Sequence, residues 1–554
     1  MKGKGDFTRD TFDPRRHYSA VRLQQGRVGL DADFNEQADI VRHRTETGSA
    51  DALGPSAAPR AAAGFRVEAT PDGADLLLFP GRLYAGGVLA ELHAEPEVAI
   101  TAFPAADRVQ VAEDALLGVA LEAGDWVEVL DDDVAAAGEA GTVARVEELD
   151  REAGEARLSE DVSAHDGPGG PRFRRLATYS TQPDLPEPPP LPGADGWYLL
   201  YLDVWRHHVT ALEDPGIREL ALGGPDTATR ERTVAQVRWL EAGGPADDVH
   251  CLTEPDGWLE EIAPSLGTLR ARSRPDESPD NPCTVPAGGG YTRLENQLYR
   301  VEVHRGGAPG DDPPPTCKWS RENGSIVTRW IGQDGDRLTV EESGRDAVRA
   351  FAPGHWVELT DSGRELRGEP GTLVQLAGVA GDVLTLDPAT ATGPTDLAEF
   401  TPGPKVRRWD MPAESGVIEI GAAGDWISLD GGIEIRFGAG SYRTGDYWLI
   451  PARTFAGSFA GDVLWPRDEA TGEAVPRPPD GIEHRHAKLG LLRREGGVLT
   501  VTDCRKTFPA ATELVRFYRA GGDGQEARPG LELPCDLAVA VADGQWPVAG
   551  ARIR

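Results

Sequence analysis

The sequence predicts a mostly β, multi-domain protein. Three observations support this fold class: an excess of turn-forming residues, short strands with two-residue alternation, and an internal duplication. The 554 residues suggest three or four domains. Glycine (67) and proline (44) together make up about a fifth of the chain, against roughly 12% in globular proteins. Such an excess is typical of many turns between short strands.

The duplication joins two segments far apart in the chain. Residues 124–142 (GDWVEVLDDDVAAAGEAGT) align without gaps to residues 354–372 (GHWVELTDSGRELRGEPGT), with nine of nineteen positions identical. Matching blocks flank the pair in the same order, namely DRVQV (107–111) with DRLTV (336–340) and PRFRRL (171–176) with PKVRRW (404–409). Chance does not explain three matched blocks in one order.

Each copy contains four or five short strands, which predicts a small barrel because a closed sheet has no unpaired edges. In DWVEVL, Trp126 and Glu128 lie on one strand face and Val127 and Val129 on the other. We therefore expect two small β-barrels with Trp126 and Trp356 at equivalent buried positions. Both tryptophans are interpreted as structural core anchors rather than as sugar-binding platforms.

The rest of the chain is predicted from local patterns. Residues 32–47 form a helix, 75–92 two strands, and 196–212 a strand pair rich in aromatic residues. Residues 227–240 are ambiguous between helix and strand, and the β-branched Thr233, Val234 and Val237 favour strand. The expected organisation is an N-terminal docking arm and helix (1–50), a β-hairpin region (51–106), barrel copy 1 (107–178), a central β domain (193–330), barrel copy 2 (336–410), a C-terminal β region (411–508) and a further domain beginning at 512–554.

Charge and hydropathy exclude several classes of function. The net charge of −34 argues against nucleic acid or an anionic membrane as the partner. Residues 1–44 differ from the rest, with nine Lys/Arg and seven Asp/Glu, a net charge of +2. The start MKGKGDFTRDTFD is polar and lacks the apolar core of a signal peptide. No apolar run approaches the ~18 residues that are needed to cross a bilayer. Synthesis in the cytoplasm, without membrane insertion, is expected.

The five cysteines, Cys251, Cys283, Cys317, Cys504 and Cys535, form no CxxC pair. Their scattered positions and odd number indicate neither a zinc ribbon nor a disulfide framework. This agrees with a reducing cytoplasm.

Asp31, Asp33 and Asn35 alternate as ligands do in a calcium loop, but the spacing does not fit. A twelve-residue loop starting at Asp31 requires Gly at position 36 and Glu at position 42, where the sequence has Glu36 and Arg42. Helix capping is the better interpretation, with Asp31 or Asp33 accepting the first amide hydrogens and Glu36 completing a capping box. We expect no calcium dependence.

Catalytic and metal motifs are also weak. His484 and His486 would face one side of a strand, as metal ligands do, but no third ligand is identifiable and an exposed pair without metal is the more common case. Ser320 lacks the GxSxG elbow of a hydrolase, and the chain has neither a P-loop nor a GxGxxG motif. The sequence therefore predicts a protein that is not an enzyme and binds no metal or cofactor.

Several blocks resemble an uncharacterised family found in phage-tail-like gene clusters, notably those of extracellular contractile injection systems. They include GDFTRDTFDPRRHYSAVRLQQGRVGLDADFNEQADI (5–40), YLDVWRHHVTALEDP (201–215), LGGPDTATRERTVAQVR (222–238), LENQLYRVEVH (294–304), KWSRENGSIV (318–327) and GDYWLIPART (445–454). The resemblance implies a structural particle component near the baseplate or fibres, whose partners are baseplate, spike or fibre proteins. A homo-oligomer is compatible with it. Assembled particles could be released to the exterior.

The N-terminal segment is then interpreted as a docking arm. Its candidate docking residues are Arg15, Arg16, Arg22, Arg27, Asp31, Asp33 and Asn35. We expect the arm to lie apart from the barrel cores, so that deleting residues 1–45 removes attachment and leaves the β-modules folded. Two alternatives stay open: a receptor- or carbohydrate-binding fibre protein, suggested by 13 tryptophans and the loops 273–290 and 306–316, and a glycan hydrolase, suggested only by abundant carboxylates.

The C-terminal residues 514–554 resemble the beginning of a bacterial immunoglobulin-like domain of the invasin type. Leu537, Val539 and Val541 alternate with alanines, as in a strand. A complete sandwich of this class requires about 100 residues and about seven strands. The resemblance therefore implies further domains beyond Arg554, or a partner chain that completes the sandwich.

Overall fold

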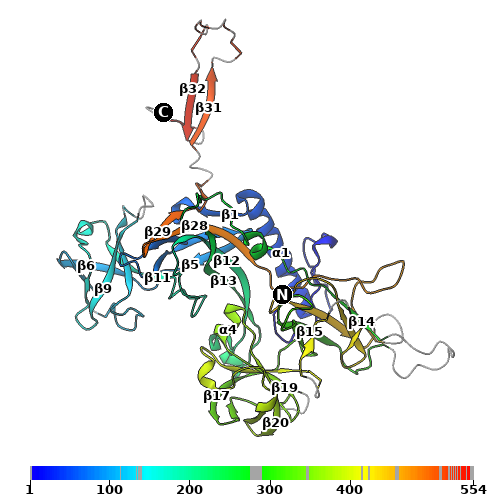
Figure 1. Ribbon diagram of the computed structural model, residues 1–554. Coiled ribbons are helices and arrows are strands. Elements are labelled where there is room, and N and C mark those ends of the chain that lie inside the picture. Colours follow the sequence, from blue (N-terminus) through cyan, green and yellow to red (C-terminus); the bar gives the residue numbers. More distant parts are fainter. Residues whose placement is uncertain are drawn as a thin grey trace, which may run out of the picture.

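A computed structural model describes most of the chain. The described residues are 3–112, 114–132, 134, 140–274, 290–344, 349–412, 416–421, 424–455 and 461–510, with part of 515–548. The predicted fold class is confirmed: the protein is mostly β, with several antiparallel sheets and two closed six-stranded barrels. Figure 1 shows the barrels on different sides of a central body.

The first half of the body is a sandwich of two sheets. One sheet has the order β13-β12-β28-β29 and the other β30-β1-β4-β5, and their apolar faces share one core. The strands are β1 (Ser56–Pro59), β4 (Gly81–Ala85), β5 (Val88–Leu92), β12 (Gly196–Val209), β13 (Arg230–Gly243), β28 (Arg485–Glu495), β29 (Val498–Asp503) and β30 (Thr507–Phe508). The long strand β12 pairs with both β13 and β28, and its two faces pack on separate cores: Leu200 and Leu202 enter the core shared by the two sheets, whereas Leu199 and Tyr201 enter a second one.

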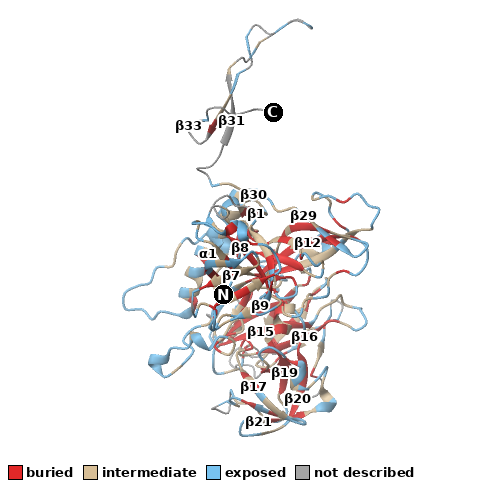
Figure 2. Cartoon of the chain, turned by 90° about the vertical axis from the view of Figure 1, so that its left-hand side faces the viewer, coloured by how far each residue is buried: buried red, intermediate tan, exposed pale blue. Residues whose placement is uncertain are grey.

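The second half of the body packs a five-stranded sheet, β23-β16-β15-β26-β27, near a three-stranded sheet, β14-β25-β24. The two share a core rich in aromatic side chains. The strands are β14 (Leu269–Ser273), β15 (Gln297–Arg305), β16 (Thr316–Ser320), β23 (Ile418–Glu419), β24 (Ile427–Ser428), β25 (Ile433–Phe437), β26 (Tyr447–Arg453) and β27 (Asp462–Val463). Figure 2 shows that burial is concentrated in interior strands such as β12, β15 and β16.

The duplicated segments form the two barrels, with the same strand order. Barrel 1 contains β6 (Glu97–Ala105), β7 (Arg108–Val111), β8 (Trp126–Leu130), β9 (Thr142–Asp150), β10 (Glu155–Leu158) and β11 (Arg172–Thr178). Barrel 2 contains β17 (Val327–Asp334), β18 (Arg337–Val340), β19 (Trp356–Thr360), β20 (Thr372–Ala380), β21 (Val383–Asp387) and β22 (Lys405–Trp409). Barrel 1 is closed by the pairing of β11 with β8, and barrel 2 by the pairing of β22 with β17. Each barrel also uses a strand, β6 or β17, that starts upstream of the predicted boundary.

Trp126 and Trp356 occupy equivalent buried positions, as expected, with 9% and 6% of their surface exposed. They are nevertheless outside the barrel cores, which contain Val127 and Val129 in one copy and Val357 and Leu359 in the other. Trp126 packs on Leu77 and Phe79 of β3 (Leu76–Phe79), and Trp356 joins the aromatic core of the body. The tryptophans therefore fasten each barrel to its neighbour.

A glycine shared by the two copies also has a structural cause. The amide of Gly141 donates to Glu128 Oε1 at 2.9 Å, and that of Gly371 donates to Glu358 Oε1 at 3.3 Å. A Cβ atom on Gly141 would lie 2.2 Å from the Val129 carbonyl oxygen. Only glycine fits this close approach without movement of the backbone.

Several local predictions are corrected. The helix α1 runs from Asp31 to Leu53 with Leu30 as N-cap, so Asp33 is the N3 residue whose carboxylate accepts from the Leu30 amide at 3.2 Å. Asp31 and Glu36 instead accept from Thr8 and Thr11 of the arm. Residues 75–92 form three strands, and 196–209 one long strand in place of a pair, because β12 continues without a turn. The strand expected at 227–240 is confirmed as β13.

Shorter elements complete the fold. The helix α3 (Trp258–Ile262) follows β13, the helix α4 (Ser362–Arg367) lies between β19 and β20 of barrel 2, and the strand β2 (Arg66–Ala69) pairs with β3. The 3₁₀ turns are η1 (Pro14–Arg16), η2 (Arg60–Ala62), η3 (Ser163–His165), η4 (Pro215–Ile217), η5 (Leu220–Leu222), η6 (Pro388–Thr390) and η7 (Leu397–Glu399). Leu366 of α4 packs on Trp205 and Val234, which joins barrel 2 to the first sandwich.

The cysteine prediction is wrong for one pair. Cys251 and Cys504 form a disulfide between residues 253 positions apart, with Cα atoms 5.3 Å from each other. Chain spacing could not reveal it, because the fold brings the loop after β13 next to the end of β29. Cys317 is buried and Cys535 exposed, both as free thiols.

The C-terminal strands form a sheet of their own, β31-β32-β33. These strands are β31 (Val515–Gly521), β32 (Ala538–Asp543) and β33 (Trp546–Pro547). Figure 1 shows the β31–β32 hairpin standing away from the body. Leu537, part of the predicted alternation, lies outside the described residues. The start of an immunoglobulin-like domain remains a prediction.

Candidate functional site

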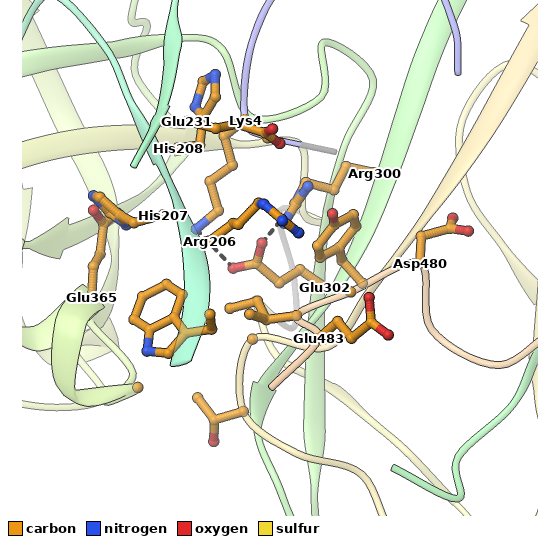
Figure 3. Close-up of a pocket in the computed structure, with 18 of the residues that line it drawn as sticks. Lys4, Arg206, His207, His208, Glu231, Arg300, Glu302, Glu365, Asp480 and Glu483 are labelled. Carbon is orange, nitrogen blue, oxygen red and sulfur yellow. Dashed lines mark hydrogen bonds and ion pairs between the residues drawn. The ribbon is translucent and has the colours of Figure 1, made fainter. Parts of the chain in front are cut away.

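The candidate site is a cavity of about 750 Å³ between the N-terminal arm, α1, β12, the five-stranded sheet and barrel 2. Charged side chains of both signs line it, and Figure 3 shows Lys4, Arg300 and Glu302 at its centre. None of the site residues predicted from the sequence lines the cavity. Trp356 comes nearest in the chain, because Glu358, two residues after it, is part of the cavity wall.

Strand alternation builds the charged floor. In β15, Val301 and Val303 point into the apolar core, so Arg300 and Glu302 lie on the opposite face. In β16, Cys317 and Trp319 enter the core in the same way and leave Lys318 on the cavity face. Both strands are buried on both faces, which places a polar layer inside the protein.

Glu302 is the centre of this layer. Lys4 Nζ lies 3.0 Å and Lys318 Nζ 3.3 Å from Glu302 Oε1, and Arg300 Nε donates to Oε2 at 2.6 Å. Lys318 also pairs with Glu358 of barrel 2, whose Oε2 accepts from the Trp409 indole at 2.9 Å. Arm, sheet and barrel are thereby joined through buried charges, which require such partners.

The arm is held in place at both sides of Lys4. Asn323 Nδ2 donates to the carbonyl oxygens of Gly3 and Gly5, each at 2.8 Å. Phe7 packs beside the cluster of Leu298, Tyr447 and Leu449. Lys4 also reaches the outside of barrel 2, where its ammonium lies 5.9 Å from the centre of the Trp409 ring. No described residue of the arm belongs to either barrel core.

A second charged group lies at the same cavity. Lys405 Nζ is 2.6 Å from Glu365 and 3.3 Å from Glu213, and His207 Nε2 is 2.7 Å from Glu213. His207, Glu213 and Glu365 have the spacing of a metal site. The Lys405 ammonium already lies between the two carboxylates and supplies the positive charge that a metal ion would bring.

The two barrel copies use the same glutamate differently. In barrel 1, Glu128 pairs with Arg174 of its own barrel at 2.8 Å. The equivalent Arg407 of barrel 2 instead donates to the Gly324 carbonyl, and Glu358 pairs with Lys318 of the body. One copy satisfies its buried carboxylate internally, whereas the other uses it to bind the body.

Ionisation in the floor favours a structural role. Burial opposes the charge of Glu358, but Lys318 and Lys4 outweigh it and lower its pKa to about 2. Burial is likewise outweighed at Glu302 by Lys4 and Arg300, so its pKa lies well below 4.5. A general acid requires a raised pKa, and these carboxylates have the opposite shift.

This gives a prediction for pH. Because both pKa values are lower in the folded than in the unfolded protein, the stabilisation is complete above about pH 4.5 and is lost as the pH falls toward about 2. Urea unfolding across this range should show a steep fall in unfolding free energy. Glu358→Gln should reduce that fall, and an unchanged pH profile in this variant would contradict the assignment.

The histidine pair differs from its prediction. His484 and His486 are both half-buried, and the buried Asp203 of β12 supplies the third group that the sequence did not identify. His484 Nδ1 lies 2.8 Å and His486 Nε2 3.5 Å from the same oxygen, Asp203 Oδ1. Pairing of β12 with β28 brings Asp203 opposite His486, although they are far apart in sequence.

The predicted docking residues lie outside the cavity. Arg15, Arg16, Arg22, Arg27 and Asp31 are exposed, whereas Asp33 and Asn35 are half-buried. Lys4, Glu302, Lys318 and Glu358 were missed. For Glu302, Lys318 and Glu358 the signal is a charged residue between two apolar residues of a strand, as in LYRVEVH and TCKWS. Lys4 lies in no strand and has no such signal.

Taken together, the modules define a β-rich, multi-module protein with a buried charged junction. The chain belongs to a family of unknown function (DUF6519), which matches residues 1–108, 191–254 and 261–542. The match omits 109–190, so β8 to β11 of barrel 1 fall outside it, whereas barrel 2 is included. No curated protein and no solved structure matches the chain.

Proposed function

We propose that the protein is a non-enzymatic structural component of a contractile, phage-tail-like injection particle, and that its N-terminal segment binds an acidic neighbouring subunit near the baseplate or fibres. The observation that carries the proposal is the surface of residues 14–34. Leu23, Val28 and Phe34 are 76%, 86% and 78% exposed there. Apolar side chains in such numbers on one surface segment are typical of interaction sites.

Charge indicates the kind of partner. Residues 14–30 (PRRHYSAVRLQQGRVGL) contain four arginines and no acidic residue. Among the described residues, only Arg15 of these four has an ion pair, with Asp13. Arg16, Arg22 and Arg27 are exposed and available to a carboxylate-rich surface.

The anchoring of the flanking residues supports this role. Residues 3–8 are fixed to the body through Asn323 and Arg453, and α1 begins at Asp31 against Thr8. A segment fixed at both ends loses less conformational entropy on binding than a free tail. Its basic and apolar side chains are thus presented at a defined place.

The alternatives have less support. Apart from Trp546, whose side chain is not described, every tryptophan is buried or half-buried. The guanidinium groups of Arg272 and Arg436 lie 3.9 and 4.8 Å from the centre of the half-buried Trp426 ring, which leaves less of that ring for stacking on a sugar. Part of the loop 273–290 lies outside the described residues. No helix in the described part of the chain has both the length and the apolar character for crossing a bilayer.

The test is co-sedimentation with assembled particles. Arg22→Glu combined with Arg27→Glu should abolish co-sedimentation, because it reverses the charge of the docking segment without touching the buried junction. Arg218→Glu with Arg230→Glu, at two exposed arginines elsewhere, should bind normally.

Full co-sedimentation of the Arg22/Arg27 variant would contradict the proposal. It would also be contradicted if the parent protein self-associates and the same substitutions abolish that self-association, because the segment would then bind a second copy of this chain. A deletion of residues 1–45 would not test attachment alone. It also removes Lys4 and residues 31–45 of α1, so it would damage the body.

A further inference from the structure

We propose that Asp203, His484 and His486 bind one divalent transition-metal ion, such as Zn²⁺. Two imidazole nitrogens and one carboxylate oxygen form a typical ligand set for Zn²⁺ and related ions. The three ligand atoms all lie within 4.8 Å of one another. Zinc–ligand distances of about 2.0–2.2 Å can be reached from this spacing by small side-chain movements.

The geometry at Asp203 favours a metal over a simple hydrogen bond. Both histidine nitrogens converge on one oxygen, Oδ1, at 2.8 and 3.5 Å. The other oxygen, Oδ2, lies 3.6 Å from Arg238 Nε. Arg238 therefore orients the carboxylate so that its second oxygen faces the two imidazoles, as groups around a metal site orient its ligands.

Aromatic side chains hold the two imidazoles parallel. The rings of His484 and His486 are 6.2 Å apart with an interplanar angle of 15°. Trp205 lies 5.7 Å from the His484 ring, and Tyr201 and Trp258 lie about 6 Å from His486. This wall restricts ring rotation, so the ligands are positioned before an ion arrives.

Access and coordination are compatible with binding. Asp203 and His486 side chains are each 7% exposed, whereas His484 is 28% exposed and forms the open side. Three protein ligands leave a fourth position for water. The second histidine-containing cluster, around Glu213, does not offer the same chemistry, since Lys405 lies between its carboxylates.

The experiment uses the full chain in a Cys535→Ser background, which removes the free thiol that is exposed in the described part of the chain. After treatment with a chelator and dialysis, titration calorimetry with Zn²⁺ should show one equivalent bound. His484→Ala should weaken binding at least 10–100-fold, the effect that loss of even an outer-shell partner has. His93→Ala, at an exposed histidine outside the cluster, should bind as the parent does.

Two further measurements make the result decisive. Circular dichroism establishes that each variant is folded, and Asp203→Asn provides a nearly isosteric second variant that should also lose binding. Co²⁺ should give a visible absorption band in the parent that is absent from His484→Ala. The proposal is overturned by no saturable equivalent, by equal affinity in His484→Ala, or by a loss in Glu213→Gln with none in His484→Ala.

Discussion

Replacement of Lys318 by alanine should destabilise the protein by about 3–5 kcal/mol, the usual cost of removing one partner from a buried ion pair. Lys318 Nζ joins Glu302 of the body to Glu358 of barrel 2, and its side chain is only 4% exposed. Without the Lys318 ammonium, the buried carboxylates of Glu302 and Glu358 each lose one of the cations that compensate their charge. The ammonium also lies 4.7 Å from the centre of the Trp409 ring and would lose that contact.

The measurement is urea unfolding at neutral pH, with Arg108→Ala as control. Arg108 pairs with Glu155 on the partly exposed surface of barrel 1, where such pairs contribute about 0–1 kcal/mol. Adding Glu358→Gln to Lys318→Ala should recover part of the loss, because it removes one unpaired charge. A Lys318→Ala effect no larger than that of Arg108→Ala would refute the role of the buried junction.

Trp356→Ala should also cost about 3–5 kcal/mol, the range for a buried large-to-small substitution of an aromatic residue. Trp356 contributes to the aromatic core of the body, and its indole donates to the Pro412 carbonyl at 3.1 Å. Because Val357 and Leu359 fill barrel 2 from the other strand face, the barrel core itself is unchanged. The variant should loosen the attachment of barrel 2 rather than unfold it.

The equivalent substitution in barrel 1 provides a matched comparison. Trp126 packs in a smaller cluster with Leu77, Phe79 and Leu176, so Trp126→Ala should cost less than Trp356→Ala. Differential scanning calorimetry and limited proteolysis between the modules would compare them. Full retention of stability in both variants would show that these tryptophans do not fasten the barrels.

The barrels were predictable because their information is local. Strand alternation and the duplication both survive in short stretches such as DWVEVL, so the fold class and the burial of Trp126 followed directly. The sequence did not show whether Trp126 faces the core of the barrel or its outer surface. Two-residue alternation separates two faces but does not reveal which one encloses the core.

The charged junction was harder to predict because its partners are remote. Lys4, Glu302 and Glu358 belong to three modules, and nothing in their separate neighbourhoods indicates that they meet. Asp203 and the Cys251–Cys504 pair were missed for the same reason, since β12–β28 pairing and a loop contact bring them together. The arm also appeared independent because its charge differs from that of the rest.

The ion pair between Lys4 and Glu302 constrains the order of events during translation. At about 5–20 residues per second, the roughly 400 residues between Lys4 and the end of β22 require about 20–80 s of synthesis. Barrel 1 is complete by Thr178 and can close while the ribosome is still working. The first segment made must wait, solvated and unpaired, until Glu302 and Glu358 have emerged and folded. The beginning of the chain is therefore among the last parts to reach its final place.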